Sequence, residues 1–128
     1  MLSFDNFLQT EGMPIYLQII RYIKQGLVAG TVQDGEELPS RRVLSALLAV
    51  NPNTIQKAYR ILEEEGLVVS RSGAKSYIAA DQTQINQVRS ELLEGDMRQM
   101  AGAMKQMGLT REAAHRLLDQ LFYEEENT

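Results

Sequence analysis

Two short helices joined by a tight turn are the feature of this sequence that most limits its fold. Ser40 is placed to cap the first helix, which ends near Leu48. Asn51 and Pro52 then mark a new helix, because asparagine accepts hydrogen bonds from free N–H groups and proline fits the first helical position. This second helix extends to about Glu65. Two such helices separated by a turn of about three residues form a helix-turn-helix.

Apolar residues recur on one face of each predicted helix, as expected for helices that pack on a common core. The inward positions of the first helix are Val43, Leu44 and Leu47. Those of the second helix are Ile55, Ala58, Tyr59 and Leu62. An earlier helix between Pro14 and Gly30 repeats an apolar residue every four positions, at Ile15, Ile19, Ile23 and Leu27. We interpret the first dozen residues as an arm.

The hydrophobic period changes after Gly66. Residues 67–70 and 76–79 are short β-prone runs, and the polar segment 71–75 between them predicts a hairpin. A hairpin that directly follows a helix-turn-helix is a wing. We therefore expect a mostly α fold with a small β-hairpin, in which residues 1–80 form a winged helix-turn-helix DNA-binding domain.

The C-terminal part of the chain has a different pattern. An amphipathic helix is predicted from Gln84 to Met107, and Thr110 caps another helix after Gly108. Two helices with wide apolar stripes and no third element must bury those stripes, and a second copy of the chain is the simplest cover. We therefore expect a two-helix dimerisation region over residues 81–128. The expected homodimer interface consists of Ile85, Val88, Leu92, Met97, Met100, Met104, Met107, Leu117, Leu121 and Phe122.

The net charge of −4 is unevenly distributed. Residues 1–80 contain eight basic and eight acidic residues, so the whole negative balance lies in the C-terminal part. Between Arg41 and Lys75 there are six basic residues and three acidic ones, and the acids are grouped at the end of the second helix. A negative total therefore does not exclude a local surface that attracts DNA.

Several classes of protein are disfavoured by what the sequence lacks. Without cysteine there are no disulfides, thiolate metal sites or cysteine nucleophiles, and a single histidine excludes a site with two imidazoles from one chain. No segment approaches the roughly 20 apolar residues of a membrane span. The first residues have neither a basic leader nor a long apolar run. We expect a cytoplasmic protein without a metal or cofactor.

The carboxylates and the single histidine do not form a catalytic pattern. Glu63, Glu64 and Glu65 are consecutive, so their side chains spread around a helix and do not converge. His115 and Asp119 are four residues apart on a predicted helix, but no serine or cysteine nucleophile is placed with them. We therefore expect no enzymatic activity.

Polar residues at the start of the second helix have the chemistry for reading DNA. A helix fits the major groove, where asparagine and glutamine pair with adenine, and lysine reaches phosphate or guanine. The candidate base-reading residues are Asn51, Asn53, Thr54, Gln56 and Lys57. The candidate phosphate contacts are Arg41, Arg42, Arg71 and Lys75. Each of these residues alone also fits a helix cap or a solvated charge, and it is their convergence on one surface that favours DNA binding.

The order and spacing of several motifs in residues 13–80 resemble the GntR family of bacterial transcription regulators. The motifs are Pro14-Ile15-Tyr16-Leu17-Gln18-Ile19, Leu38-Pro39-Ser40-Arg41-Arg42, Val50-Asn51-Pro52-Asn53-Thr54-Ile55, Ala58-Tyr59 and Leu62-Glu63-Glu64-Glu65-Gly66-Leu67. The resemblance implies a dimeric repressor that binds a pseudo-palindromic operator. It also implies DNA contacts by Arg42, by the polar residues that open the second helix, and by the wing-tip segment Ser72-Gly73.

Two features refine this resemblance. Many relatives have a more basic wing than Arg71-Ser72-Gly73-Ala74-Lys75, so a weaker minor-groove contact is expected here. The C-terminal part is too short for the large effector domains of most of the family and resembles the short YtrA-like subfamily, whose tail serves dimerisation. Members of that subfamily often control a neighbouring transporter operon. No residue pattern identifies a small-molecule effector.

Two alternatives stay open at this point. The same winged fold also serves as a protein–protein interaction module without sequence-specific DNA binding. The methionines at positions 97, 100, 104 and 107 suggest soft-metal binding, since thioethers are soft ligands, but a methionine stripe at helical spacing is more often an interface or core. We therefore assign these methionines to the dimer interface.

Overall fold

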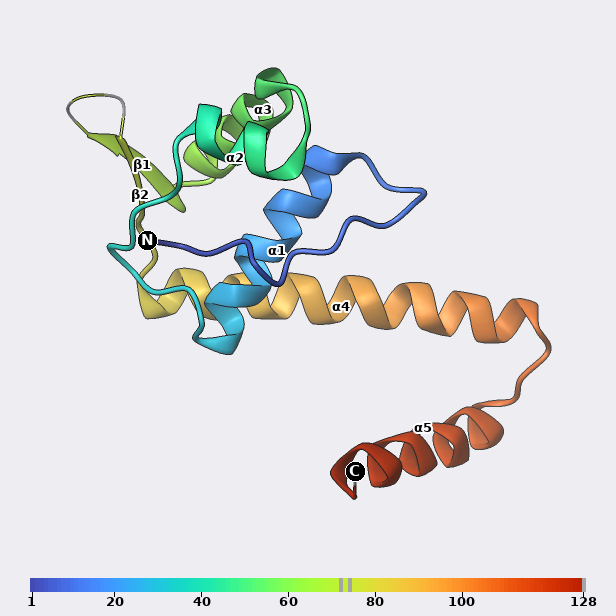
Figure 1. The fold of residues 1–128 in the computed structure, drawn as a ribbon. Helices are drawn as coiled ribbons and strands as arrows, with labels where there is room; N and C mark the ends of the chain where they lie inside the picture. The colour runs from blue at the N-terminus through green and yellow to red at the C-terminus, as the bar shows by residue number, and fades with distance from the viewer. Residues whose placement is uncertain (72, 74, 128) are drawn as a thin grey trace. The chain divides into compact units, whose positions relative to one another are not determined.

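The computed structural model describes residues 1–71, 73 and 75–127 (Figure 1). Its elements are α1 (Ile15–Ala29), α2 (Arg41–Leu48), α3 (Pro52–Glu64), β1 (Val68–Arg71), β2 (Lys75–Ile78), α4 (Gln82–Gln106) and α5 (Arg111–Glu126). The chain divides into two compact units, Met1–Ser90 and Glu91–Thr128, and α4 contributes residues to both. This order of elements confirms the mostly helical fold with one hairpin. The functional division between residues 80 and 81 stays a prediction.

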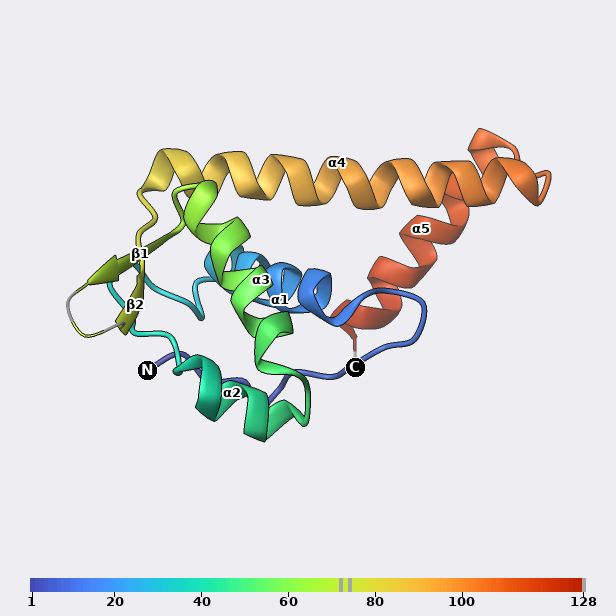
Figure 2. The ribbon, with the colours of Figure 1, turned by 90° about the horizontal axis from the view of Figure 1, so that it is seen from above.

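The first unit is built on α1, α2 and α3, and α3 packs against both other helices (Figure 2). Pro14 precedes the first turn of α1, and Gly30 ends the helix with a left-handed backbone at a φ of 86°. Glycine adopts this conformation without steric cost, so the chain can turn away from the helix axis. Ile23, Leu44 and Ile55 are fully buried where the three helices meet.

The connection between α2 and α3 confirms the predicted helix-turn-helix. The Ser40 hydroxyl accepts a hydrogen bond from the Val43 amide at 3.1 Å, which caps α2. Ala49 adopts a left-handed backbone at a φ of 56° and reverses the chain. The Asn51 side-chain oxygen then accepts a hydrogen bond from the Asn53 amide at 2.8 Å, which caps α3. Both caps satisfy N–H groups that have no partner inside a helix.

The predicted inward face of α2 was wrong at two of its three positions. Val43 and Leu47 are 56% and 60% exposed, and Leu44 alone of the predicted trio is buried. The face that packs on the core instead includes Ser45 next to Leu44. Ser45 tolerates burial because its hydroxyl donates a hydrogen bond of 2.7 Å to the Val50 carbonyl oxygen.

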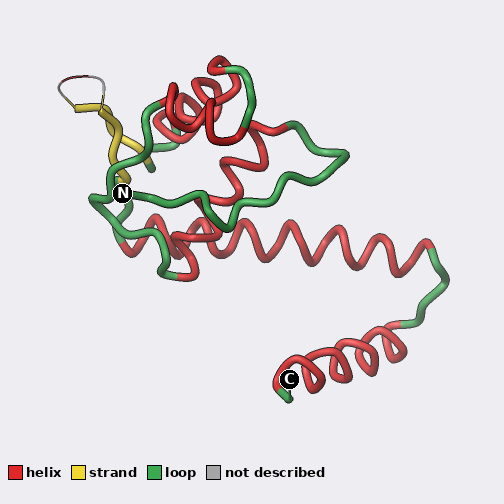
Figure 3. Tube along the Cα trace, in the orientation of Figure 1, coloured by secondary structure: helices red, strands yellow, loops and turns green. Residues whose placement is uncertain are grey.

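The wing is an antiparallel hairpin with Val68 opposite Ile78 and Arg71 opposite Lys75. The tube in Figure 3 shows its two strands in yellow. The segment before α2 extends the pairing, because the Leu38 amide donates to the Ser76 carbonyl at 2.9 Å and the Ile78 amide donates to the Glu36 carbonyl at 2.8 Å. These bonds tie the base of the wing to the chain that leads into α2.

The N-terminal arm is part of the core of the first unit. Leu2 and Phe4 are buried, and the Phe4 ring stacks on Tyr22 of α1 with 4.9 Å between centroids. Gln18, a buried polar residue of α1, accepts a hydrogen bond from the Thr10 amide and donates to the Thr10 carbonyl, both at 2.8 Å. The arm is therefore held by apolar packing at one end and by a paired amide at the other.

The second unit contains the end of α4 and the whole of α5. Gly108 follows α4 with a φ of 80°, and Thr110 caps α5 by accepting a hydrogen bond from the Ala113 amide at 3.1 Å. No residue of α5 is buried within the described chain, and the exposed large apolar side chains of this helix are Leu117, Leu121, Phe122 and Tyr123. Among the described residues, no helix combines the length and apolar character that a bilayer span requires.

Candidate nucleic-acid interface

The first two turns of α3 present polar side chains to solvent. α3 buries Ile55 and Ala58 against the rest of the first unit, which turns the intervening residues outward. The outward set comprises the exposed Asn51, Asn53, Gln56 and Lys57, with Thr54 half-buried beside them. The structure therefore brings all five candidate base-reading residues to one end of one helix.

The two asparagines at this end differ in which side-chain polar groups remain free for a further hydrogen bond. The side-chain oxygen of Asn51 accepts the capping hydrogen bond from the Asn53 amide. The side-chain nitrogen of Asn51 is therefore the group that remains free to donate a hydrogen bond to a base or a phosphate. Asn53 uses only its backbone in the cap, so its side-chain amide keeps both an acceptor and donors for an adenine edge.

A pocket of about 470 Å³ lies between the start of α2 and the wing. Its lining includes Arg41, Arg42 and Lys75, together with Gly73 from the wing. Arg42 is exposed, whereas Arg41 is half-buried and its Nε atom has no hydrogen-bond partner among the described residues. Three cations around one hollow at a helix N-terminus provide a positive surface of the kind that attracts phosphate oxygens.

Tyr59 fixes the segment that carries these arginines. Its phenol donates a hydrogen bond of 2.7 Å to the Pro39 carbonyl oxygen and is itself buried. Burial raises the pKa of the Tyr59 phenol well above its ordinary value, and the Arg41 guanidinium only partly opposes this. The phenol therefore stays protonated and can keep donating. Sequence reasoning placed Tyr59 in the core by its spacing, but nothing in the pattern indicated this hydrogen bond.

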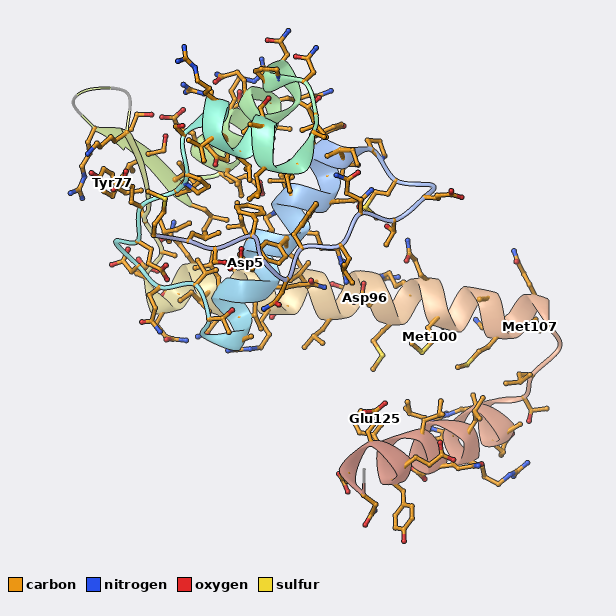
Figure 4. All side chains as sticks on the ribbon, in the orientation of Figure 1. Asp5, Tyr77, Asp96, Met100, Met107 and Glu125 are labelled. Atoms are coloured by element: carbon orange, nitrogen blue, oxygen red, sulfur yellow. The ribbon has the colours of Figure 1, made fainter. Side chains whose placement is uncertain are left out.

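The two cations of the wing lie on opposite strands at its tip. The Arg71 guanidinium lies over the Tyr77 ring, 5.0 Å from its centroid, and Lys75 is exposed opposite Arg71 in the strand register. Tyr77 is labelled in Figure 4. Gly73 has a φ of 78°, which favours glycine at this turn. Ser72, the other predicted wing-tip contact, lies outside the described residues.

Lys57 has a contact that the sequence did not predict. Its ammonium lies 4.0 Å from the centroid of the Tyr16 ring on α1. A cation–π contact of this kind holds the ammonium beside α1. Sequence spacing could not have indicated this contact, because Tyr16 and Lys57 lie far apart along the chain and meet only in the folded structure.

The surface as a whole combines groups that bind bases and phosphates. The amides at the start of α3 are exposed, and Arg41, Arg42 and Lys75 line one pocket between the start of α2 and the wing. Within the part of the chain that the structure describes, histidine, aspartate and glutamate form no group of three that would hold a metal ion. Exposed hydrogen-bonding amides and phosphate-binding cations on the same domain are typical of a protein that binds duplex DNA.

The predicted dimer residues differ in how much of each is exposed within one chain. Val88 is only 5% exposed and Ile85 is half-buried, both in the first unit. Val88 therefore has almost no surface left for a second copy. Leu92 and Met104 are half-buried. The remaining predicted residues are exposed within one chain, namely Met97, Met100, Met107, Leu117, Leu121 and Phe122.

Comparisons with known proteins identify the family to which this chain is similar. The sequence profile of bacterial regulatory proteins of the gntR family matches residues 15–78. The chain is 36% identical over 94 residues to the HTH-type transcriptional repressor YtrA of Bacillus subtilis, covering 73% of this chain and 68% of that protein. It is 38% identical over 112 residues to the uncharacterized HTH-type transcriptional regulator YhcF of Bacillus subtilis, covering 84% and 88%. A GntR family transcriptional regulator from Listeria monocytogenes has a similar structure, with a TM-score of 0.77 and 31% identity over 88% of this chain and 98% of that one.

Proposed function

The chain belongs to the GntR family of bacterial regulatory proteins and is a DNA-binding transcriptional regulator, and we propose that it is a homodimeric repressor of a pseudo-palindromic operator. The observation that carries this proposal is the exposed polar start of α3, together with the cations that line the pocket between the start of α2 and the wing. YtrA of Bacillus subtilis, which is 36% identical, is a transcriptional repressor, and this supports the sign of regulation proposed here.

The proposed contacts with DNA form two sets, contacts to phosphates and contacts to bases. Phosphate contacts orient a protein on DNA without reading sequence, while hydrogen bonds to base edges provide specificity. We assign the phosphate contacts to Arg41, Arg42, Arg71 and Lys75, and to Lys57 as well. We assign base reading to Asn51, Asn53, Thr54 and Gln56. Gly73 allows the wing to approach the duplex closely, and Ser72 keeps its assignment from the family resemblance.

A second copy of the chain completes the proposed repressor. The exposed apolar residues of α4 and α5 would cost free energy in water, and burying them against the same surface of another copy removes that cost. Two copies related by a two-fold axis present two α3 helices to successive major grooves, about 34–36 Å apart. The operator is then expected to have two-fold symmetry.

The genetic context follows from the resemblance to the YtrA-like subfamily. We propose that the repressor controls a neighbouring transporter operon and acts in the cytoplasm, where its operator lies. No small-molecule effector is part of this proposal.

A gel-shift titration tests the proposed function. The full chain is titrated against a fragment of its own promoter and against a random duplex of equal length and composition, at about 50 mM and about 200 mM salt. A sequence-specific DNA-binding protein shifts the promoter fragment at a lower protein concentration than the random duplex. Its affinity falls steeply as salt is raised, because binding releases counterions from the DNA. A winged-helix protein-interaction module, the alternative function, would show no preference for the promoter fragment.

A further inference from the structure

The side chain of Gln84 joins the start of α4 to the end of α3. Its oxygen accepts a hydrogen bond of 2.9 Å from the Asp81 amide, and the Asp81 carboxylate accepts one of 2.8 Å from the Gln84 amide. This reciprocal pair is a capping box, which satisfies free N–H groups at the start of a helix. The side-chain nitrogen of Gln84 donates a third hydrogen bond, of 3.1 Å, to the carbonyl oxygen of Gly66, the second residue after α3 (Figure 2). Only one orientation of this side-chain amide satisfies both partners, since its oxygen must face an N–H and its nitrogen a carbonyl.

The chain that leads into α4 is fixed on the first unit as well. The Ala80 amide donates a hydrogen bond of 2.9 Å to the Asp34 carboxylate, which lies in the connection after α1. One turn beyond Gln84, Val88 lies on the same face of α4 and is only 5% exposed. The first two turns of α4 are therefore held on the first unit by the packing of Val88 and by the hydrogen bond from Gln84.

The end of α3 is in turn attached to α1 and to the wing. Lys24 of α1 forms an ion pair of 2.8 Å with Glu65, and the Ser70 hydroxyl of β1 donates a hydrogen bond of 2.6 Å to the Glu63 carboxylate. Two of the three consecutive glutamates therefore connect elements of the first unit, which their spacing along the helix did not indicate. Because these contacts hold the end of α3, the hydrogen bond from Gln84 attaches α4 to a fixed point of the first unit.

We propose that Gln84 is a positioning residue, which sets the direction in which α4 leaves the first unit and thereby the spacing of operator half-sites that the dimer accepts. This inference rests on the homodimer proposed above, in which α4 leads from each α3 toward the partner copy. The separation of the two α3 helices in such a dimer depends on every joint between them, and the joint at Gln84 occurs once in each copy. A joint fixed by directed hydrogen bonds favours the spacing that it already fits, because no free energy is spent on ordering it when the dimer binds.

Gln84→Glu separates this role from the stability of α4. A glutamate at this position still accepts the hydrogen bond from the Asp81 amide, as in the usual capping box, so α4 is expected to keep its start. It has no N–H to donate, and its negative charge faces the Gly66 carbonyl oxygen, so the joint is lost. Gln82→Glu is the matched control, because it adds the same charge in the same turn, at a side chain that donates to Asn86 of α4 itself at 3.0 Å.

The test measures, by fluorescence anisotropy, the affinity of the full chain for its promoter operator and for the same operator with an insertion between the half-sites. An insertion of about 2 base pairs rotates one half-site by about 70° around the duplex axis. The wild type and Gln82→Glu are expected to lose at least about tenfold in affinity on insertion, because the DNA or the protein must be deformed to fit. Gln84→Glu is expected to bind the unaltered operator about two- to tenfold more weakly, as for one lost hydrogen bond, and to lose only about threefold or less on insertion.

The affinity for a duplex with a single half-site should be the same in all three proteins, since Gln84 is not one of the proposed DNA contacts. Gln84→Met, a neutral variant that also lacks the donor, is expected to show the same reduced insertion penalty, and urea denaturation checks that each variant is folded. Equal insertion penalties in the wild type and in both Gln84 variants would overturn this proposal and leave the proposed function intact. A wild type that binds both operators equally well would contradict the homodimeric repressor itself, and this proposal with it.

Discussion

At the residue scale, the side chains around the start of α3 differ in which of their polar groups remain free. The oxygen of Asn51 is committed to the helix cap, and the ammonium of Lys57 rests on Tyr16. Asn53 is exposed and keeps its whole side-chain amide. Lys75 is exposed on the wing and presents a point charge. Asn53 is therefore the best placed to distinguish bases, and Lys75 is suited to contact any phosphate.

Substituting these two residues separates base reading from phosphate binding. Asn53→Ala is expected to weaken operator binding by about 1–3 kcal/mol with little effect on random DNA, because one bidentate base contact is lost. Lys75→Ala should weaken binding to both duplexes equally and reduce the salt dependence by about one counterion. Fluorescence anisotropy with labelled duplexes at several salt concentrations measures both effects. Equal losses on operator and random DNA for both variants would defeat this division of roles.

Tyr59 contributes to stability through one buried hydrogen bond. Tyr59→Phe removes the donor to the Pro39 carbonyl while keeping the ring in the core. The expected loss is about 1 kcal/mol in the free energy of unfolding, since the carbonyl loses its partner. Urea denaturation measures this loss. Tyr16→Phe is the control, because it removes a tyrosine hydroxyl and keeps the ring that Lys57 contacts. An unchanged unfolding midpoint for Tyr59→Phe would show that the bond contributes nothing.

At the element scale, what the sequence predicts well is local. Ser40, Asn51 and Thr110 were predicted as caps, and each accepts the expected backbone hydrogen bond. The helices end close to Gly30 and Gly66, which both adopt a positive φ. Such features depend on a few neighbouring residues, so the sequence contains all the information that determines them.

Features that depend on contacts between distant segments were not predictable in this way. The inward face of α2 was misassigned because hydrophobicity alone ranks Val43 above Ser45, and the compensating Ser45–Val50 hydrogen bond is visible only in the fold. The position of the arm depends on Gln18 pairing with the Thr10 backbone. The candidate base-reading residues could be predicted from their position at the start of a helix. The contact between Lys57 and Tyr16 could not, because it depends on how α3 packs against α1.

Gly26 tests the packing of α1 against the chain that follows it. A Cβ at Gly26 would overlap with the Cγ2 atom of Val32, a stiff and buried side chain. Gly26→Ala is therefore expected to destabilise the fold by about 1–3 kcal/mol, which outweighs the gain of up to about 1 kcal/mol in helix propensity. Urea denaturation gives the value.

Gly102→Ala is the matched control, because a Cβ at this helical position of α4 meets nothing within 4 Å. This variant should be neutral or stabilised by up to about 1 kcal/mol. If both variants show the same gain in stability, the close contact between Gly26 and Val32 does not limit the packing.

At the scale of the whole molecule, the proposed repressor requires two copies joined through α4 and α5. Leu121→Glu places a charge on the predicted interface and is expected to weaken the dimer at least about tenfold, because an unpaired charge cannot be buried cheaply. Tyr123→Glu adds the same charge to another exposed apolar position of α5 outside the predicted interface. Sedimentation velocity between nanomolar and micromolar concentrations measures both. A wild type that is monomeric at micromolar concentration, or two variants with equal dimer stability, would contradict the predicted interface.

The most direct test of paired reading is selection of bound sequences from a random duplex library by the full chain. A two-fold dimer is expected to enrich a motif with two-fold symmetry, whose half-site centres are about 10 base pairs apart. In Asn53→Ala, base preference within each half-site should be lost. Enrichment of an unpaired, asymmetric motif, or no enrichment over the starting library, would contradict the claim that two copies place α3 in successive grooves of one duplex.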